Sequence, residues 1–167
     1  MATAAKRIAI LHPDLGIGGA EQLIINVALS LQQRGYDVTI YTPFFDPNRC
    51  LQDAKQCNVS VKGNWFPVSI FGRFKALCAY IRMVLCAMYV VFCARAFDYY
   101  MLDQVSLPIP ILRCRNRKVL FYCHYPDKLL STNRTSLAMK AYRLVLDTLE
   151  EATTAMAHTT LVNSKYT

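Results

Sequence analysis

The chain is 167 residues long, carries a formal net charge of +8 and is 54% hydrophobic. This length suits one domain whose core is large enough to fold without disulfides. A basic and strongly apolar chain is expected beside nucleic acid or beside an anionic membrane surface. The seven cysteines form no Cys-x-x-Cys pair, which excludes zinc and thioredoxin-type chemistry and favours reduced thiols.

The basic charge is concentrated where the chain is also aromatic. No acidic residue occurs between Ala54 and Phe97, whereas the lysines and arginines there are mixed with aromatic side chains and long aliphatic runs. This pattern fits a membrane interface, with packing in a protein core as the alternative, and it argues against a nucleic-acid partner.

Apolar runs and turn residues predict strands that alternate with helices. The predicted strands cover residues 7–12, 37–42, 59–62, 98–102, 118–123 and 159–162, and the predicted helices cover 20–34, 72–97 and 136–157. Residues 48–55 are predicted as a loop or short helical turn, and Pro108 and Pro110 mark a short helix or loop. The alternation predicts an α/β fold: a Rossmann-like parallel sheet with helices on both faces.

Polar residues lie at the ends of several predicted strands. They are His12, Asp103, His124 and Asn163. Ligands of such sheets bind beyond the C-terminal ends of the strands, so we expect the functional site at this edge.

A glycine-rich loop joins the first predicted strand to the first predicted helix. Gly16, Gly18 and Gly19 would let a phosphate group reach the free N–H groups of the helix N-terminus, with a tight turn as the alternative. The dinucleotide fingerprint is broken, because Glu21 stands where its last glycine belongs and the second strand ends in Thr42 rather than an acid. No Gly-Lys-Ser/Thr follows the loop. These departures argue against a nicotinamide enzyme and exclude a Walker P-loop.

The loop also carries a resemblance to a known family. The stretch "HPDLGIGGAE" (residues 12–21) resembles the N-terminal signature of retaining glycosyltransferases with two facing Rossmann-like domains, the GT-B fold. The stretches "LDQVS", "FYCHYPD", "LVNSKYT" and "CAYIRMVL" extend the likeness over nearly the whole chain, toward the mannosyltransferases that assemble dolichol-linked oligosaccharides. The chain is thereby expected to be the acceptor-side, N-terminal domain of such an enzyme, without the C-terminal domain that holds the nucleotide sugar.

The resemblance also implies roles for particular residues. Gly16, Gly18 and Gly19 would face the diphosphate of the donor GDP-mannose, and His124 would lie beside the transferred sugar as the catalytic residue. Contacts to the acceptor or to sugar hydroxyls would come from a second set: Glu21, Asp103, Asp127 and Asn163. For Glu21 the alternative is a favourable charge at the helix N-terminus. No metal and no other cofactor is expected.

Residues 65–97 are predicted to associate with a membrane. The expected contacts are Trp65, Phe66, Arg82 and Tyr89. Residues 76–94 are nearly long enough to span a bilayer, which takes about 20 apolar residues, but Arg82 makes spanning costly. Three arrangements stay open for this segment: a helix lying in the membrane surface, a buried core helix and a transmembrane helix.

The resemblance implies transfer of mannose from GDP-mannose to a dolichyl-diphosphate-linked oligosaccharide, α-1,3 and then α-1,6, in protein N-glycosylation. The expected location is the cytosolic face of the endoplasmic reticulum membrane, because the N-terminus does not resemble a signal peptide. Other mannosyltransferases of the pathway are expected partners. The alternative is a non-catalytic, membrane-associated module that binds the lipid-linked acceptor or a partner transferase.

Overall fold

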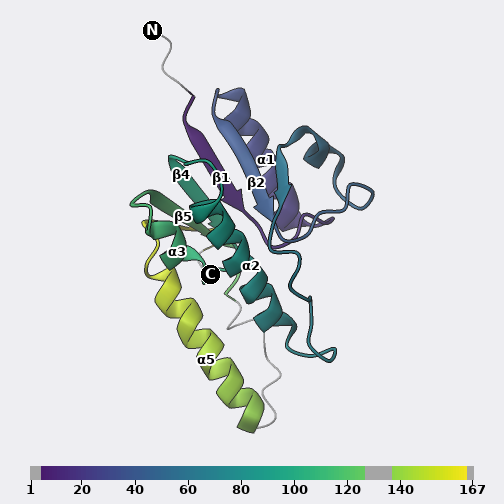
Figure 1. Ribbon diagram of the computed structural model, residues 1–167, viewed down its shortest axis with the longest axis vertical. Helices are drawn as coiled ribbons and strands as arrows, with labels where there is room; N and C mark the ends of the chain where they lie inside the picture. The colour runs from purple at the N-terminus through teal and green to yellow at the C-terminus, as the bar shows by residue number, and fades with distance from the viewer. Residues whose placement is uncertain (1–4, 127–136, 165–167) are drawn as a thin grey trace.

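The computed structural model describes residues 5–126 and 137–164. These residues form a parallel sheet of six strands in the order β3-β2-β1-β4-β5-β6 (Figure 1). The strands are β1 Arg7–Leu11, β2 Asp37–Thr42, β3 Val59–Val61, β4 Tyr99–Asp103, β5 Lys118–Cys123 and β6 Thr159–Val162. The helices are α1 Gly19–Gln33, the 3-10 helix η1 Gln52–Gln56, α2 Lys75–Phe92, α3 Ile109–Arg113 and α5 Leu137–Thr154. The predicted Rossmann-like α/β fold is confirmed.

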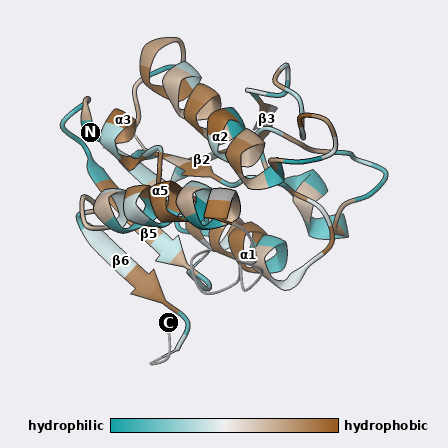
Figure 2. Ribbon diagram, turned by 90° about the horizontal axis from the view of Figure 1, so that it is seen from below, coloured by the Kyte–Doolittle hydropathy of each residue, from teal (hydrophilic) through white to brown (hydrophobic). Residues whose placement is uncertain are grey.

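Helices cover both faces of the sheet and build a separate core on each. On one face, Ile24 and Ile25 of α1 pack with Ile10 of β1. On the other face, α2, α3 and α5 pack over side chains that include Leu102 and Phe121. Figure 2 shows α1 and α2 on opposite sides of the strands. Strands buried on both faces read as nearly continuous apolar runs, which is why the sequence predicts them well.

Helix α2 is shorter than the predicted helix 72–97. Gly72 and Phe74 adopt left-handed φ values of 68° and 56°, so the helix begins only at Lys75. Among the described residues, α2 is the one helix long and apolar enough to cross a membrane, with a mean hydropathy of 1.7, and 44% of it is buried in the fold. The core helices of soluble proteins meet the same criterion. In this structure α2 packs as a core helix.

The strand order places a switch point between β1 and β4. The chain runs from β1 outward to β2 and β3, and then returns through α2 to β4 on the other side of β1. Connections that leave two adjacent strands in opposite directions open a crevice at the carboxyl ends of those strands. Residues that follow β1 and residues that end β4 therefore meet in one place.

Candidate functional site

A buried polar cluster occupies this switch point. We call it the polar corner and define it as His12, Glu21, Asp103 and His124. His12 follows β1, Asp103 ends β4, and His124 follows β5. The His12 Nδ1 and Asp103 Oδ2 atoms form a hydrogen bond of 2.7 Å, and both side chains are 0% exposed. The sequence pattern predicted that these residues lie at the carboxyl ends of strands, and the structure confirms that placement.

Asp103 lies between two imidazoles. Its Oδ1 atom is 3.1 Å from Nε2 of His124, although the two atoms are not aligned as a hydrogen bond. The His124 ring also packs on Tyr122, with 4.7 Å between ring centroids. The Asp103 side chain has no exposed surface in this structure, and its predicted contact with sugar hydroxyls stays a prediction. Asp103 bonds His12 and lies beside His124.

His12 is the residue that the sequence placed at a strand end but did not assign to the site. Its Nε2 atom is 3.9 Å from Oε1 of Glu21 and is buried without a hydrogen-bond partner. Burial alone would lower the pKa of His12, but the interactions with Asp103 and Glu21 outweigh burial and raise that pKa. The same His12 imidazole lowers the pKa of Glu21. The polar corner thus favours a protonated His12 between two carboxylates.

The glycine loop leads from the polar corner into α1. Gly18 caps the helix in an extended conformation and Gly19 is its first residue, so left-handed backbone does not explain these glycines. A Cβ on Gly18 would collide with the Glu21 carboxylate, whereas a Cβ on Gly19 would meet nothing within 4 Å. Gly18 therefore leaves space for Glu21, and Gly19 leaves the helix N-terminus open. Open N–H groups at a helix N-terminus can bind an anion.

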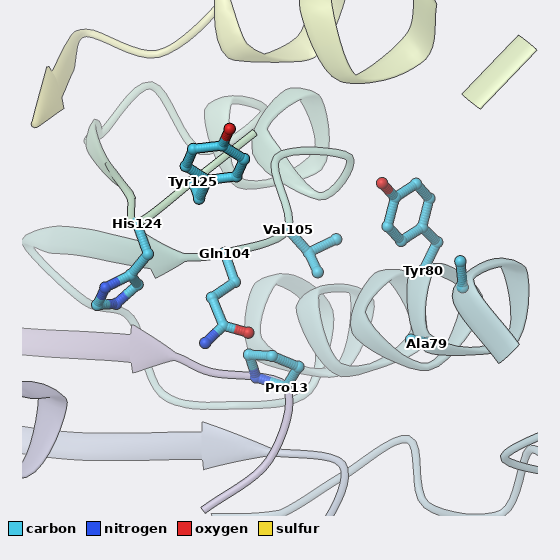
Figure 3. Close-up of a pocket in the computed structure, with 8 residues that line it drawn as sticks. Pro13, Ala79, Tyr80, Gln104, Val105, His124 and Tyr125 are labelled. Carbon is cyan, nitrogen blue, oxygen red and sulfur yellow. The ribbon is translucent and has the colours of Figure 1, made fainter. Parts of the chain in front are cut away.

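His124 faces a cavity of about 330 Å³, which we call the His124 cavity (Figure 3). Its lining residues are Pro13, Ala76, Ala79, Tyr80, Gln104, Val105, His124 and Tyr125. A mostly apolar cavity with one imidazole at its edge can hold a sugar ring and hydrogen-bond one of its hydroxyls. His124 is the predicted site residue that the structure places in such a cavity.

Comparison with known proteins shows the family to which the chain belongs. The profile of Glycosyltransferase Family 4 matches residues 17–167. The chain belongs to Glycosyltransferase Family 4. It is 48% identical over 165 residues to the Mus musculus protein named Alpha-1,3/1,6-mannosyltransferase ALG2, and 50% and 47% identical to proteins of the same name from Dictyostelium discoideum and Homo sapiens.

These alignments cover 96% of this chain but 40%, 39% and 39% of the three relatives. The chain thus spans about two fifths of the length of the curated relatives it matches. Among solved structures, the crystal structure of LpCGTa in complex with UDP superposes with a TM-score of 0.56 at 12% identity, covering 96% of this chain and 46% of that chain. That likeness shows the fold.

Asn163 is not among the described residues that line the His124 cavity, although it lies beside His124, because Cys123 of β5 pairs with Val162 of β6. Asn163 follows β6 and is exposed at the edge strand of the sheet. Asp127 lies outside the described residues. Among the residues that the structure describes, no group of three or more His, Cys, Asp or Glu side chains could hold a metal ion.

The predicted membrane contacts divide into two groups. Trp65 is 74% exposed and Phe66 is partly exposed in the loop before α2. Arg82 and Tyr89 instead turn inward from α2: Arg82 is buried, and Tyr89 packs on Tyr41 and under the Lys62 ammonium. The side chain of Arg82 is thus buried in the fold, and its membrane contact stays a prediction. The helical spacing put Arg82 on α2 but could not reveal that its face of the helix packs inward.

Proposed function

We propose that this chain is the acceptor-side part of a retaining mannosyltransferase. It would move mannose from GDP-mannose to a dolichyl-diphosphate-linked oligosaccharide, α-1,3 and then α-1,6, on the cytosolic face of the endoplasmic reticulum membrane. The observation that carries this proposal is the 48% identity over 96% of the chain with a protein named Alpha-1,3/1,6-mannosyltransferase ALG2. GDP-mannose serves as substrate, and no further cofactor or metal is part of the proposal.

The geometry supports a division of roles within the site. The N-terminus of α1, left open by Gly19, would bind the donor diphosphate and stabilise the negative charge that grows on it as the sugar leaves. His124 would hydrogen-bond the transferred sugar from the edge of its cavity. Asp103 keeps the His124 ring in place, with its Oδ1 atom 3.1 Å from His124 Nε2.

The exposed loop before α2 supports a membrane location. Trp65, Val68, Phe71 and Phe74 are large apolar side chains exposed on this loop, which also carries Arg73. We call residues 63–74 the aromatic loop. Aromatic and basic side chains together favour the interface of an anionic bilayer, where a dolichol-linked acceptor is held. Partner mannosyltransferases of the pathway would meet the protein on the same membrane.

The test is a mannose-transfer assay on the complete protein. Its coding sequence is established by sequencing the transcript past the codon for Thr167. We expect radiolabelled mannose to pass from GDP-mannose to a lipid-linked oligosaccharide. We also expect His124→Ala to lower kcat by about 100-fold or more, as loss of a group that stabilises the transition state does. His158→Ala, at the opposite edge of the sheet, is the matched control. No transfer by the wild-type protein, under conditions where the mouse relative is active, would refute the proposal.

A further inference from the structure

The buried guanidinium of Arg82 has few polar partners in the part of the chain that the structure describes. Its side chain is 8% exposed, and its Nη2 atom donates a hydrogen bond of 2.6 Å to the carbonyl oxygen of Pro43. Its Nε atom is buried without a partner, and Arg82 forms no ion pair with any residue that the structure describes. A buried guanidinium with one carbonyl acceptor is costly unless an anion completes its surroundings.

Arg82 lines a second cavity, of about 370 Å³, which we call the Arg82 cavity. Its described lining residues are Pro13, Asp14, Phe44, Arg49, Val68, Ala79 and Arg82. Two guanidinium groups thus face one carboxylate, that of Asp14, and the cavity carries a net positive charge. Pro13 and Ala79 also line the His124 cavity, so the two cavities are neighbours.

The rim of the Arg82 cavity is apolar. Val68 is 63% exposed and Phe44 is also exposed, and Val68 belongs to the aromatic loop. A cationic cavity bounded by exposed hydrocarbon suits a ligand with an anionic head and an apolar tail. A soluble anion would leave this apolar rim in water, and a neutral lipid would leave the Arg82 charge unpaired.

We propose that the Arg82 cavity binds the diphosphate of a polyisoprenyl-diphosphate lipid, with Arg82 and Arg49 as its cationic ligands. The inference rests on the proposed function. It identifies the diphosphate of the lipid acceptor as the group that the Arg82 cavity binds. The lipid tail leaves over Val68 and Phe44 toward the membrane, while the attached glycan reaches the neighbouring His124 cavity. Arg82 thereby acts inside the protein, on the lipid headgroup, rather than on the bilayer surface.

The experiment measures binding rather than turnover, so it can fail independently of the proposed function. Trp65 is the single tryptophan of the chain, and its fluorescence reports on the loop that borders the cavity. Phosphatidylcholine vesicles would carry a polyprenyl diphosphate, the matching polyprenyl alcohol, or phosphatidylserine at equal surface charge. The variants are Arg49→Gln and Arg82→Lys, with Arg34→Gln, an exposed arginine at the far end of α1, as the control of equal charge change.

We expect the wild-type chain to bind the diphosphate vesicles more tightly than the other two kinds. Arg49→Gln should weaken that binding about tenfold, as loss of a charged hydrogen bond does. Arg82→Lys should weaken it as well, Arg34→Gln should leave it unchanged, and inorganic pyrophosphate should compete. If Arg49→Gln and Arg34→Gln lose the same affinity for diphosphate vesicles, the binding depends only on general surface charge and the proposal is overturned. Equal affinity of the wild-type chain for phosphatidylserine vesicles would overturn it for the same reason. Binding of pyrophosphate without preference for the lipid would overturn the lipid assignment.

Discussion

The polar corner and the aromatic loop invert the usual distribution of side chains in opposite ways. In the polar corner, His12 and Asp103 are charged or polar groups with no exposed surface. In the aromatic loop, Phe71 is 96% exposed and Trp65 is 74% exposed. Buried polar groups must satisfy one another, whereas exposed aromatic groups gain nothing from the fold around them. The hydrogen bonds and ion pairs of the polar corner hold its side chains in place. The aromatic loop needs an apolar surface outside the protein to cover its side chains.

Backbone conformation separates the two regions in the same way. None of the four residues of the polar corner has a positive φ, while Phe71 and Phe74 adopt left-handed φ values of 50° and 56°, which are uncommon for bulky residues. Strained backbone of this kind persists where function maintains it. Substitutions in the polar corner should therefore cost stability, and substitutions in the aromatic loop should cost binding and leave stability intact.

The largest effect should come from Asp103→Asn. This change removes a buried carboxylate between two histidines and should lower the free energy of unfolding by about 3 to 5 kcal/mol. Urea denaturation measures it. Asp53→Asn is the control, because Asp53 is exposed and its carboxylate accepts a hydrogen bond from the neighbouring Gln56 amide, so its loss should cost less than about 0.5 kcal/mol. Equal losses in the two variants would show that the polar corner contributes nothing specific.

Phe71→Asn tests the aromatic loop. Moving one Phe side chain into an apolar environment contributes about 1.5 to 3 kcal/mol, so binding to anionic vesicles should weaken about 10- to 100-fold. Stability should hold or rise slightly, because asparagine tolerates the left-handed φ of 50° better than phenylalanine. Phe92→Asn is the control: Phe92 is also exposed but lies at the other end of α2. A drop in vesicle binding for Phe92→Asn as large as for Phe71→Asn would contradict a membrane-facing loop.

The sequence predicted the sheet better than it predicted the site. The strand at 37–42 is almost fully buried, leaves a strong apolar signal and matches the structure residue for residue. The strand at 118–123, buried at alternate residues, and the exposed edge strand at 159–162 also match. The placement of His12, Asp103 and His124 at the carboxyl edge of the sheet also followed from strand ends alone. The burial of Asp103 and Arg82 could not be predicted from the sequence. A strand or helix pattern does not show how completely the neighbouring loops cover a polar side chain.

The polar corner should also make stability depend on pH. The pKa of His12 is raised in the folded protein, so its contribution is full below the ordinary value of 6.5 and is lost as the pH rises through the folded value. The loss can reach about 1.4 kcal/mol per pH unit, the limit for one proton. Urea denaturation between pH 6 and about 9 should show it, and His12→Gln should flatten the profile.

The smallest effects should separate the two glycines at the start of α1. Gly19→Ala adds a good helix former into open space and should raise the free energy of unfolding by about 0.5 kcal/mol. Gly18→Ala replaces a favoured N-cap and displaces the Glu21 carboxylate, so it should lower that free energy by up to about 1 kcal/mol. In the same variant the lowered pKa of Glu21 should move back toward its ordinary value, because the carboxylate leaves His12.

Activity should not follow stability in this pair. If the open end of α1 binds the donor diphosphate, the new methyl group of Gly19→Ala blocks part of that surface, and the more stable variant should have the higher KM for GDP-mannose. A purely structural glycine at position 19 predicts the reverse, a stabilised protein with an unchanged KM. Measuring the unfolding free energy and the KM of both variants in the complete protein therefore decides whether Gly19 serves the ligand or only the helix.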